Sequence, residues 1–406
     1  MARIVQKFGG TSVADLNCIR DVAYRVKKET DAGHEVAVVV SAMSGATNQL
    51  VGWASDIGPI HDAREYDAIV ASGEQVTAGL LAIALQNIGI DARSWLGWQI
   101  PIRSDMLHGA ARIESIDGAA ISDRMKDGQV AVIAGFQGIS PGNRISTFGR
   151  GGSDTSAVAI AAALKADRCD IYTDVDGIYT TDPRIAPKAR KLSTITFEEM
   201  LEMASSGAKV LQTRSVAMAM RYNVNLQVRS SFNDSAGTLV VNEDSVVEKE
   251  SISGIAYSPD EAKITILGLP DQPGIAAGVF GALADHHVNV DMIVQSASSA
   301  TKKTDISFSI GRKDLDKAVD IIHKNKAKLD FESVDTLSNV AKISVVGTAM
   351  RTQPGVAKTM FETLASIGIN LHVISTSEIK ISVLIDAEYI ELAVRSLHTV
   401  YGLDDE

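Results

Sequence analysis

The chain has 406 residues, of which 45% are hydrophobic, and its 39 lysines and arginines are outnumbered by 50 aspartates and glutamates. This length predicts at least two domains, since single cores seldom grow beyond about 250–300 residues. The net charge of −11 argues against a nonspecific binder of nucleic acid or of a membrane surface. Cys18 and Cys169 lack metal-ligand spacing and indicate buried thiols in a reduced, cytoplasmic protein.

Neither a secretory signal nor a membrane span is expected. The N-terminal MARIVQKF reads as a strand without the apolar segment of a signal peptide. No uncharged apolar run reaches the roughly 20 residues that a membrane-spanning helix needs.

Residues 3–241 alternate short apolar strands with helical patterns, which is typical of an α/β domain. The first helix is expected at about residues 14–28, directly after a pair of glycines. Its apolar face would hold Leu16, Ile19, Val22, Ala23 and Val26. Strands are expected at residues 4–8, 36–40, 130–134, 169–173 and 225–228.

Beyond an acidic stretch at residues 243–250, which reads as a linker, the chain repeats itself. Residues 271–293 align with residues 352–374 at a constant spacing, so that Pro273 and Gly274 match Pro354 and Gly355. Each copy reads as a β-α-β-type unit, and so much matched spacing indicates a duplication. The flanking strands are expected at residues 263–267 and 305–310, and at 342–346 and 379–385.

Two familiar phosphate-binding devices are absent from the sequence: the G-x-x-x-x-G-K-[ST] loop and the glycine-rich kinase loop before a V-A-I-K strand. The KFGGTSV motif offers another. Gly9 and Gly10 let the backbone approach a ligand, and amides near a helix start can bind phosphate oxygens. Lys7 can supply a point charge there. A plain tight turn explains the same residues.

A second glycine-rich stretch, TFGRGGSDTSAVAIAAAL, leads into an Ala-rich helix. Arg150 offers a planar fork suited to a carboxylate, and Asp154 is placed where it can hold a lysine. The alternative is an ordinary loop with Ser153 or Asp154 as the helix cap.

Two further motifs are ambiguous by themselves. YTDVDGIYTTDPR, after the strand at 169–173, has ordinary turn chemistry. GAKVLQ is expected to open a helix at Gly207 with Lys209 in its first turn, where a cation is mildly unfavourable. An anionic ligand would explain that lysine, and so would simple solvation.

For three single residues, the sequence allows both a functional and a structural explanation. Ser41 ends a buried strand, where open α/β sheets bind ligands, but a structural serine fits as well. Thr47 stands at a helix start and can be a cap. Glu74 lies in a first helical turn, which favours an acid in any protein.

The motifs taken together, in their order along the chain, closely resemble those of the aspartokinases of the amino-acid kinase family. They are KFGGTSV, VVSAMSG with TN, ASGEQ, FGRGGSDT, YTDVDGIYTTDPR and GAKVLQ, followed by the doubled PG-containing unit. The resemblance covers essentially the whole chain. The related glutamate, acetylglutamate, carbamate and uridylate kinases share the sheet but not this series.

The resemblance implies an α/β three-layer sandwich with a mainly parallel central sheet over residues 1–245. Two ferredoxin-like α+β ACT domains would follow at 264–337 and 343–406, with a strand at 251–262 as a candidate completion of the second. The implied reaction transfers the γ-phosphate of ATP to the β-carboxylate of L-aspartate and gives 4-phospho-L-aspartate, the first step of lysine, threonine and methionine biosynthesis.

Roles for individual residues are also implied by the resemblance. Lys7, Gly9 and Gly10 would hold the phosphates, and Asp154 would orient Lys7. Aspartate would be bound by Arg150, Glu74, Thr47, Gly151, Gly152 and Ser153, with Ser41 beside the transferring phosphoryl group. The nucleotide would be surrounded by Thr173, Asp174, Tyr179, Arg184 and Lys209. Mg²⁺ would be held by the phosphates rather than by dedicated protein ligands.

Elementary chemistry agrees with this reaction. The aspartate side chain is already ionised at pH 7, so that it can attack the γ-phosphorus without a general base. The difficulty is the approach of two anions, which lysine, arginine, magnesium and backbone amides relieve by position and charge.

The two repeats resemble ACT domains, which sense amino acids and pair through their sheets. Asp271 would pair with an effector's ammonium, while the helix start at Gly274, Ile275, Ala276 and Ala277 receives its carboxylate. Asn289, Val290, Asp291 and Gln295 would complete the pocket. Thr352 replaces Asp271 in the second copy, which favours a structural role there. Feedback inhibition by lysine, threonine or both is expected, in a homodimer or larger assembly; a shorter regulatory chain stays open.

Three alternatives remain beside this reading. One is another acid kinase of the same fold, acting on glutamate or a uridylate. Another is a catalytically silent amino-acid sensor, and a third is a purely structural duplication. A fused homoserine dehydrogenase is not expected, because the chain stops at Glu406 directly after the second repeat.

Overall fold

The computed structural model describes residues 1–58, 62–208, 210–243, 252–298, 302–351 and 355–404. Contacts divide the chain into two compact units. Unit 1 comprises Met1–Ile178, Lys191–Ala204 and Lys209–Val247, and unit 2 comprises Tyr179–Arg190, Ser205–Ala208 and Glu248–Glu406. The expected linker at 243–250 lies, apart from Glu243, outside the described residues.

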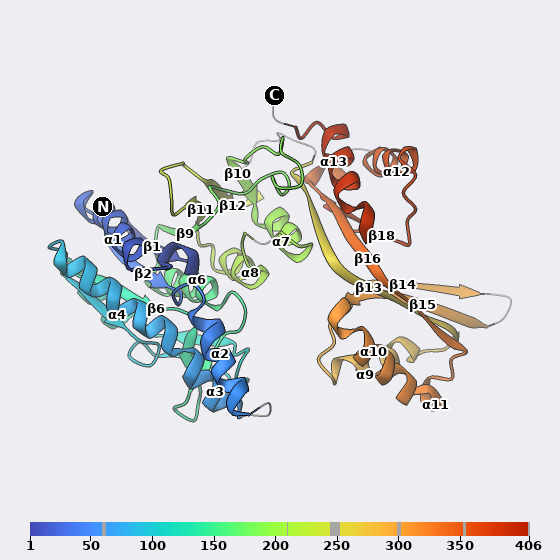
Figure 1. Ribbon diagram of the computed structural model, residues 1–406, viewed down its shortest axis with the longest axis horizontal. Coiled ribbons are helices and arrows are strands. Elements are labelled where there is room, and N and C mark those ends of the chain that lie inside the picture. The colour runs from blue at the N-terminus through green and yellow to red at the C-terminus, as the bar shows by residue number, and fades with distance from the viewer. Residues whose placement is uncertain (59–61, 209, 244–251, 299–301, 352–354, 405–406) are drawn as a thin grey trace. The chain divides into compact units, whose positions relative to one another are not determined.

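Unit 1 is built on a sheet in the order β10-β12-β11-β9-β1-β2-β6-β3, coloured from blue through green to yellow-green in Figure 1. Every pairing in it is parallel except that of β11 with β12. All five strands expected in this part of the chain are present. The strands are β1 (Arg3–Phe8), β2 (Glu35–Val40), β3 (Ala92–Trp95), β6 (Val130–Ala134), β9 (Arg168–Thr173), β10 (Thr194–Thr196), β11 (Leu226–Ser230) and β12 (Thr238–Val241).

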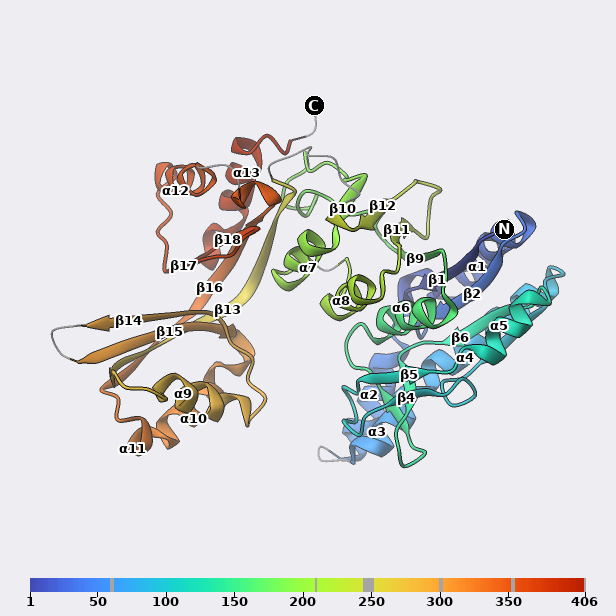
Figure 2. The same cartoon turned by 180° about the vertical axis from the view of Figure 1, so that it is seen from behind.

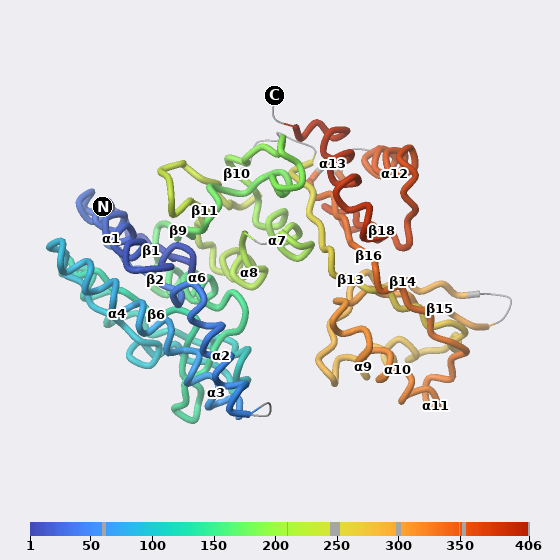
Figure 3. The backbone as a smooth tube through the Cα atoms, viewed as in Figure 1, coloured from blue at the N-terminus to red at the C-terminus, as the bar shows by residue number. Residues whose placement is uncertain are grey.

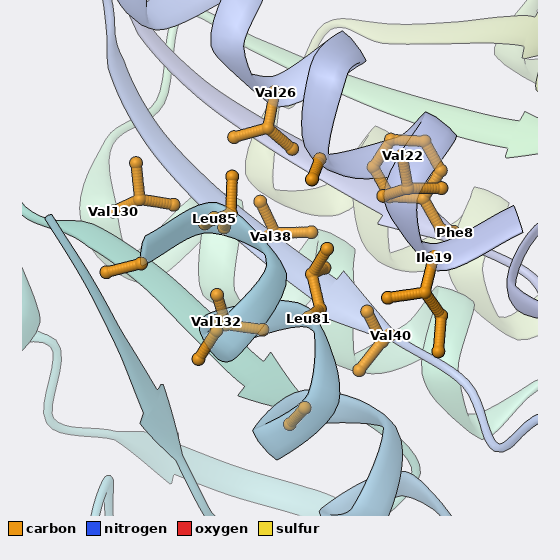
Figure 4. Close-up of a cluster of buried hydrophobic side chains, with 14 of the residues drawn as sticks. Phe8, Ile19, Val22, Val26, Val38, Val40, Leu81, Leu85, Val130 and Val132 are labelled. Carbon is orange, nitrogen blue, oxygen red and sulfur yellow. The ribbon is translucent and has the colours of Figure 1, made fainter. Parts of the chain in front are cut away.

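Helices cover both faces of this sheet and make three layers. On one face, α1 (Leu16–Asp31) and α4 (Ser72–Asn87) contribute Ile19, Val22 and Leu81 to a core shared with Val38 and Val40 of β2 (Figure 4). On the other face, α6 (Gly152–Leu164) contacts β1, β2 and β9, and α8 (Thr213–Tyr222) packs against α6. The near-continuous burial of the central strands follows from cover on both sides.

The first helix begins later than the sequence indicated. A 3-10 turn, η1 (Gly10–Val13), begins at the second glycine of the pair. Helix α1 starts only at Leu16, because the carboxylate of Asp15 caps it by accepting from two backbone amides. The expected apolar face is confirmed for its other members, but Leu16 is exposed. The cap, rather than the apolar period, therefore fixes the helix start.

A small second sheet in unit 1 has the order β5-β4-β7-β8. Its strands are β4 (Ile102–Ser104), β5 (Ile113–Ile116), β7 (Gln137–Ile139) and β8 (Ile145–Thr147). The remaining helices of this part are α2 (Ala46–Ile57), α3 (Ala63–Val70), α5 (Ala119–Lys126) and α7 (Phe197–Ser205). Helix α3 packs against β8, the last strand of this sheet, and β8 leads into the loop before α6.

One helical stretch, Ala63–Asn87, is long and apolar enough by composition to cross a membrane, and half of its most apolar window is buried inside the protein. The stretch joins α3 and α4, and α4 packs against β2, β3 and β6. Its apolar character therefore follows from its place in the core of unit 1.

Unit 2 contains an antiparallel sheet in the order β14-β15-β13-β16-β18-β17. The long strand β13 (Gly254–Pro270) pairs with β15 (Lys303–Gly311) on one side and along β16 (Ser333–Val346) on the other, and its trace runs without a break in Figure 3. The edge strands are β14 (Asp291–Ser298) and β17 (Val373–Thr376), and β18 (Lys380–Asp386) lies between β16 and β17.

Each repeat packs its helices on its own half of this sheet (Figure 2). The first repeat holds α9 (Ile275–Ala284), α10 (Leu315–Lys324) and α11 (Lys326–Leu329), and the second holds α12 (Val356–Ser366) and α13 (Ile390–Val400). Gly274 and Gly355, which the alignment pairs, both precede a helix with positive φ, at 94° and 123°. The repeat in the sequence therefore corresponds to a repeat in the structure, in which each copy has the same kind of helix start and its own hydrophobic core.

Candidate active site

The carboxyl ends of β1, β2, β6 and β9 meet at one edge of the main sheet, because these strands are parallel neighbours. Lys7 stands next to the end of β1, and its Nζ lies 2.5 Å from Oδ1 of Asp154 in the first turn of α6. Both side chains are nearly buried. The predicted pairing of these two residues is therefore present in the fold.

Gly9 and Gly10 lie directly beside this pair. A Cβ built on Gly9 would be 3.3 Å from Nζ of Lys7, and one on Gly10 would be 3.2 Å from the carbonyl oxygen of Ala42. The amide of Gly9 donates to the carbonyl of Tyr172 at the end of β9. The glycine pair thus runs close to three strand ends, where a side chain at either position would make a tight contact.

Glu74 occupies the first turn of α4, as predicted, and is almost completely buried. Its Oε1 accepts a hydrogen bond of 3.0 Å from the amide of Ala42, just after β2. Its Oε2 is buried and has no hydrogen-bond partner within the described part of the chain. Burial raises the pKa of Glu74 to about 7. An unpaired buried acceptor of this kind indicates a missing donor.

Ser41 and Ser153 approach the same edge from two elements. The amide of Ser41 donates to the carbonyl of Phe8, which ties the ends of β1 and β2 together. A Cβ on Gly135, after β6, would be 2.9 Å from both Oγ of Ser153 and the carbonyl oxygen of Val40. Ser153 therefore lies against the ends of β2 and β6.

The expectation that Ser153 or Asp154 caps α6 is wrong. Gly151 is the N-cap, with φ of 68° and no side-chain cap, and both residues fall within the first turn. A Cβ at position 151 would be 1.9 Å from Cγ of Gln212, so that the turn requires glycine on two grounds. Freed from capping, Asp154 can face Lys7.

Arg150 and Thr47 are less buried than the charged site residues described above. Arg150 is exposed in the loop between β8 and α6, flanked by Gly149 and Gly151, both with positive φ. Thr47 lies in the first turn of α2, and Gly45 rather than Thr47 occupies the cap position. The capping explanation for Thr47 is therefore excluded.

Asp67 and Arg214, which no motif singled out, hold the backbone next to Arg150. Asp67 is completely buried and binds Thr147, while the guanidinium of Arg214 donates to the carbonyls of Phe148 and Ala111. Asp67 is one of three charged residues in α3, and nothing in the sequence distinguished it from Arg64 and Glu65.

The nucleotide candidates divide between the two units. Thr173 ends β9, and its hydroxyl donates to Asp174 over 3.0 Å. Tyr179 and Arg184 belong to unit 2, within the segment Tyr179–Arg190. The loop expectation for the motif holds, but the packing of its second half on unit 2 was not foreseen.

The segment Tyr179–Arg190 is fastened to unit 2 by buried contacts. Oγ1 of Thr180 lies 2.8 Å from Nε2 of the fully buried His398 on α13, and the carbonyl of Thr180 accepts from the amide of Ile255 on β13. Ile185 joins the core of the second repeat, and Arg395 donates to its carbonyl.

The predicted helix start at Gly207 is wrong, because α8 begins only at Thr213, with Gln212 as its N-cap. The GAKVLQ motif therefore precedes the helix. Lys209 itself lies outside the described residues.

The effector candidates surround the start of α9 and the edge strand β14. Asp271, Gly274, Ala277, Asn289, Asp291 and Gln295 are exposed, Ala276 and Val290 are partly buried, and Ile275 is part of the core of the first repeat. Asp291 forms an ion pair of 2.6 Å with the buried Lys342 of β16. Thr352, the counterpart of Asp271, is outside the described residues.

Within the ranges that the structure describes, no group of three His, Cys, Asp or Glu side chains has the arrangement of a metal site. Cys18 and Cys169 are both free thiols, but only Cys169 is buried, so that the expectation of burial fails for Cys18. A magnesium ion carried by nucleotide phosphates, which needs few protein ligands, is compatible with the acidic residues present.

Comparison with known proteins places these features in a family. The amino acid kinase family matches residues 2–230, and the ACT domain matches residues 264–325 and 343–401. An aspartokinase of Pseudomonas aeruginosa is 52% identical over 406 residues, covering 100% of this chain and 98% of the relative.

Two crystal structures of E. coli aspartokinase III are also similar. The complex with aspartate and ADP has a TM-score of 0.82 at 27% identity, covering 98% of this chain and 99% of the other. The complex with lysine and aspartate has a TM-score of 0.75 at 28% identity and covers 98% of both chains.

The three-layer fold and the lysine-bearing sheet edge, with these matches, define a kinase of the amino acid kinase type that carries two ACT repeats. Within that class, the chain belongs to the aspartokinase family. The predictions of fold, of ATP-dependent phosphotransfer and of aspartate kinase activity are thereby confirmed.

Proposed function

We propose that Glu74, Arg150 and Lys7 divide the work of the aspartate kinase reaction. Oε2 of Glu74 receives the ammonium of aspartate, and the fork of Arg150 binds its α-carboxylate. The observation that carries this proposal is the buried Oε2 of Glu74, which has no hydrogen-bond partner among the described residues, in a carboxylate held next to the end of β2. Thr47, Gly151, Gly152 and Ser153 line the same substrate.

Lys7 supplies the charge at the transferred phosphoryl group. Its ammonium lies next to Gly9, so that phosphate oxygens can reach both the backbone and Nζ. Asp154 holds Lys7 in place, and Ser41 stands beside the phosphoryl group at the end of β2. Thr173 and Asp174, with Tyr179, Arg184 and Lys209, surround the nucleotide, whose Mg²⁺ neutralises phosphate charge when bound.

The chemical step needs no general base. An oxygen of the ionised β-carboxylate attacks the γ-phosphorus, and the bond from this phosphorus to the β,γ-bridging oxygen breaks. ADP leaves with that electron pair, and 4-phospho-L-aspartate is formed. The lysine, held by its buried partner, acts without reorganisation as negative charge shifts toward the leaving oxygen.

The ACT repeats regulate this step by binding lysine, threonine or both. The E. coli relative solved with lysine supports an amino-acid effector. Asp271 and the start of α9 hold the amino-acid backbone, and Asn289, Val290, Asp291 and Gln295 complete the site. Since Asp291 is paired with Lys342, an effector ammonium at Asp291 competes with that internal cation. An effector must bind the two regulatory states with different affinity.

The chain is proposed to act in the cytoplasm as a homodimer or larger assembly that pairs through the ACT repeats. The edge strands β14 and β17 expose Ile293 and Ile374, which supports pairing there. The kinase domain takes residues 1–245, and the repeats take 264–337 and 343–406, with the first part of β13 paired to β16 of the second. A separately made regulatory chain is a further hypothesis from the family resemblance.

Aspartate-dependent ATP turnover, with hydroxylamine trapping of the acyl phosphate, tests this proposal. Aspartyl hydroxamate is expected from the wild-type chain, with a strong rise in the KM for aspartate for Glu74→Gln and Arg150→Ala. Titration with lysine and threonine, singly and together, is expected to lower the rate. Full activity at saturating concentrations of both would exclude the regulatory part.

A further inference from the structure

The loop that carries Arg150 is fixed from outside by two side chains, Asp67 and Arg214. Asp67 lies on α3, completely buried, at the position where α3 contacts β8. Its carboxylate accepts hydrogen bonds from both the amide and the hydroxyl of Thr147, at 3.1 and 2.5 Å. Thr147 is the last residue of β8 and stands three positions before Arg150.

The same carboxylate also holds a second segment against the Arg150 loop. The amide of Gly109 donates to both of its oxygens at 3.1 Å, and Nδ1 of His108 lies 2.7 Å from Oδ2. Gly109 in turn packs on Gly149: a Cβ at position 149 would be 3.2 Å from the carbonyl oxygen of Gly109. Asp67 therefore fixes both the strand before Gly149 and the backbone that covers it.

Arg214 completes the restraint from the other side. Its Nη1 donates to the carbonyl of Phe148 at 2.9 Å, and its Nη2 donates to the carbonyl of Ala111 at 2.7 Å. The amide of Ala111 donates to the carbonyl of Thr147, so that the two segments are tied at several points. A cation in the first turn of α8 is unfavourable by the helix dipole, and these two carbonyls explain its position.

With these contacts, both backbone polar groups of Thr147 and of Phe148, and the carbonyl of Gly149, have hydrogen-bond partners. The amide of Phe148 donates to the carbonyl of Phe136, and the carbonyl of Gly149 accepts from the amide of Gly152. Arg150 follows directly, with its side chain exposed. The backbone from which this side chain extends is thus held by the contacts on Thr147, Phe148 and Gly149.

We propose that Asp67 and Arg214 are positioning residues for aspartate binding, which act through the Thr147–Gly149 backbone to place Arg150. The inference rests on the proposed role of Arg150 in holding the substrate carboxylate. A bidentate contact tolerates little displacement, and a shift of about 1 Å can cost about 100-fold in rate. Without either anchor, aspartate binding weakens while the nucleotide side of the site is untouched.

Steady-state kinetics of Asp67→Asn and Arg214→Lys test this inference in the full chain. Asparagine keeps the shape but turns a donor toward the amides of Thr147 and Gly109. Lysine replaces the two guanidinium nitrogens, which donate to separate carbonyls in a fixed planar geometry, by a single ammonium nitrogen. We expect the KM for aspartate to rise about tenfold or more in both variants, with the KM for ATP within twofold of wild type.

Asp170→Asn is the matched control, because Asp170 is also completely buried and is bound by an arginine, Arg168, in unit 1. This variant should lose stability with an unchanged KM for aspartate. A purely structural role for Asp67 and Arg214 would give the same result in their variants, and that outcome would overturn the inference. If Asp67→Asn does not fold, Arg214→Lys alone decides it.

The Arg150→Ala variant separates this inference from the proposed function. If Arg150→Ala leaves the KM for aspartate unchanged, the assignment of Arg150 fails, and the inference fails with it. If Arg150→Ala raises that KM while Asp67→Asn and Arg214→Lys do not, only the inference is wrong.

Discussion

Lys7 and Asp154 form a nearly buried ion pair, 2.5 Å between Nζ and Oδ1, at the carboxyl edge of the main sheet. Removal of one partner from a buried pair costs about 3–5 kcal/mol, because the other charge is left unpaired. The pair is therefore a structural element as well as a source of charge for the phosphates.

Lys7→Met should reduce kcat by about 100-fold or more, since a preorganised cation at the phosphoryl group is lost. It should also lower the free energy of unfolding, because Asp154 is left buried and unpaired. The double variant Lys7→Met with Asp154→Asn should recover much of that stability but none of the activity. Chemical denaturation and steady-state kinetics on the three proteins measure both effects. A double variant less stable than the single one contradicts the pairing.

Glu74 predicts a specific dependence of aspartate binding on pH. Its pKa is raised to about 7 by burial. In the proposed site, the ionised form of Glu74 binds the substrate ammonium. The KM for aspartate should therefore fall as pH rises from 5.5 to 8, by up to about tenfold per pH unit below 7. Glu74→Gln should raise the KM and remove this dependence. An unchanged pH profile in Glu74→Gln would remove Glu74 from the site.

The same raised pKa predicts an effect on stability. Because the folded value lies above the ordinary value of 4.5, ionisation is less favourable in the folded protein. The free energy of unfolding should then decline as pH rises from 4.5 to about 7, and Glu74→Gln should be more stable than wild type at pH 8, by about 1–3 kcal/mol. Urea denaturation at pH 5 and 8, without substrate, measures the difference. Equal stability at both pH values argues against a buried ionised carboxylate.

Thr180 and His398 predict a link between nucleotide binding and the second repeat. Thr180→Val leaves Nε2 of the buried His398 without its partner, which should lower the free energy of unfolding by about 1–3 kcal/mol. If Tyr179 and Arg184 bind the nucleotide, the KM for ATP should rise and the KM for aspartate should not. Thr399→Val makes the same chemical change next to His398 at an exposed position and serves as the control. The same KM for ATP in both variants would show that the segment Tyr179–Arg190 does not contribute to nucleotide binding.

Asp271 predicts which copy senses the effector. Asp271→Ala should weaken inhibition by lysine or threonine about tenfold or more, because an ammonium partner is lost, with basal activity unchanged. Glu332→Ala, on an exposed ion pair with Lys303 elsewhere in the first repeat, is the control. Inhibition curves that coincide for Asp271→Ala and wild type would place the effector elsewhere.

The strands and the repeat were predictable because their signals are local. β6 spans the residues that the sequence indicated, because a short uninterrupted apolar run is typical of a strand that is buried on both faces. Gly274 and Gly355 likewise followed from the alignment of the two copies. The pairing of Lys7 with Asp154 came from the family resemblance rather than from spacing, because 147 positions separate the two residues along the chain.

The remaining features depend on contacts that no local pattern records. The start of α6 was set by close approach of Gly151 to Gln212. The start of α1 is different, because Asp15 caps it through a local contact that the apolar pattern alone does not show. The packing of Thr180 on His398 joins residues 218 positions apart. Asp67 was missed for the same reason: its four donors come from the end of β8 and from a loop at His108 and Gly109, both distant in the sequence.

The measurement that tests the account most directly is the rate of aspartyl hydroxamate formation from ATP, with aspartate and glutamate compared in wild type and Lys7→Met. The account predicts a product with aspartate, little with glutamate, and a loss of about 100-fold or more in Lys7→Met at saturating aspartate. Near wild-type turnover in a folded Lys7→Met protein would contradict the role of the Lys7–Asp154 pair.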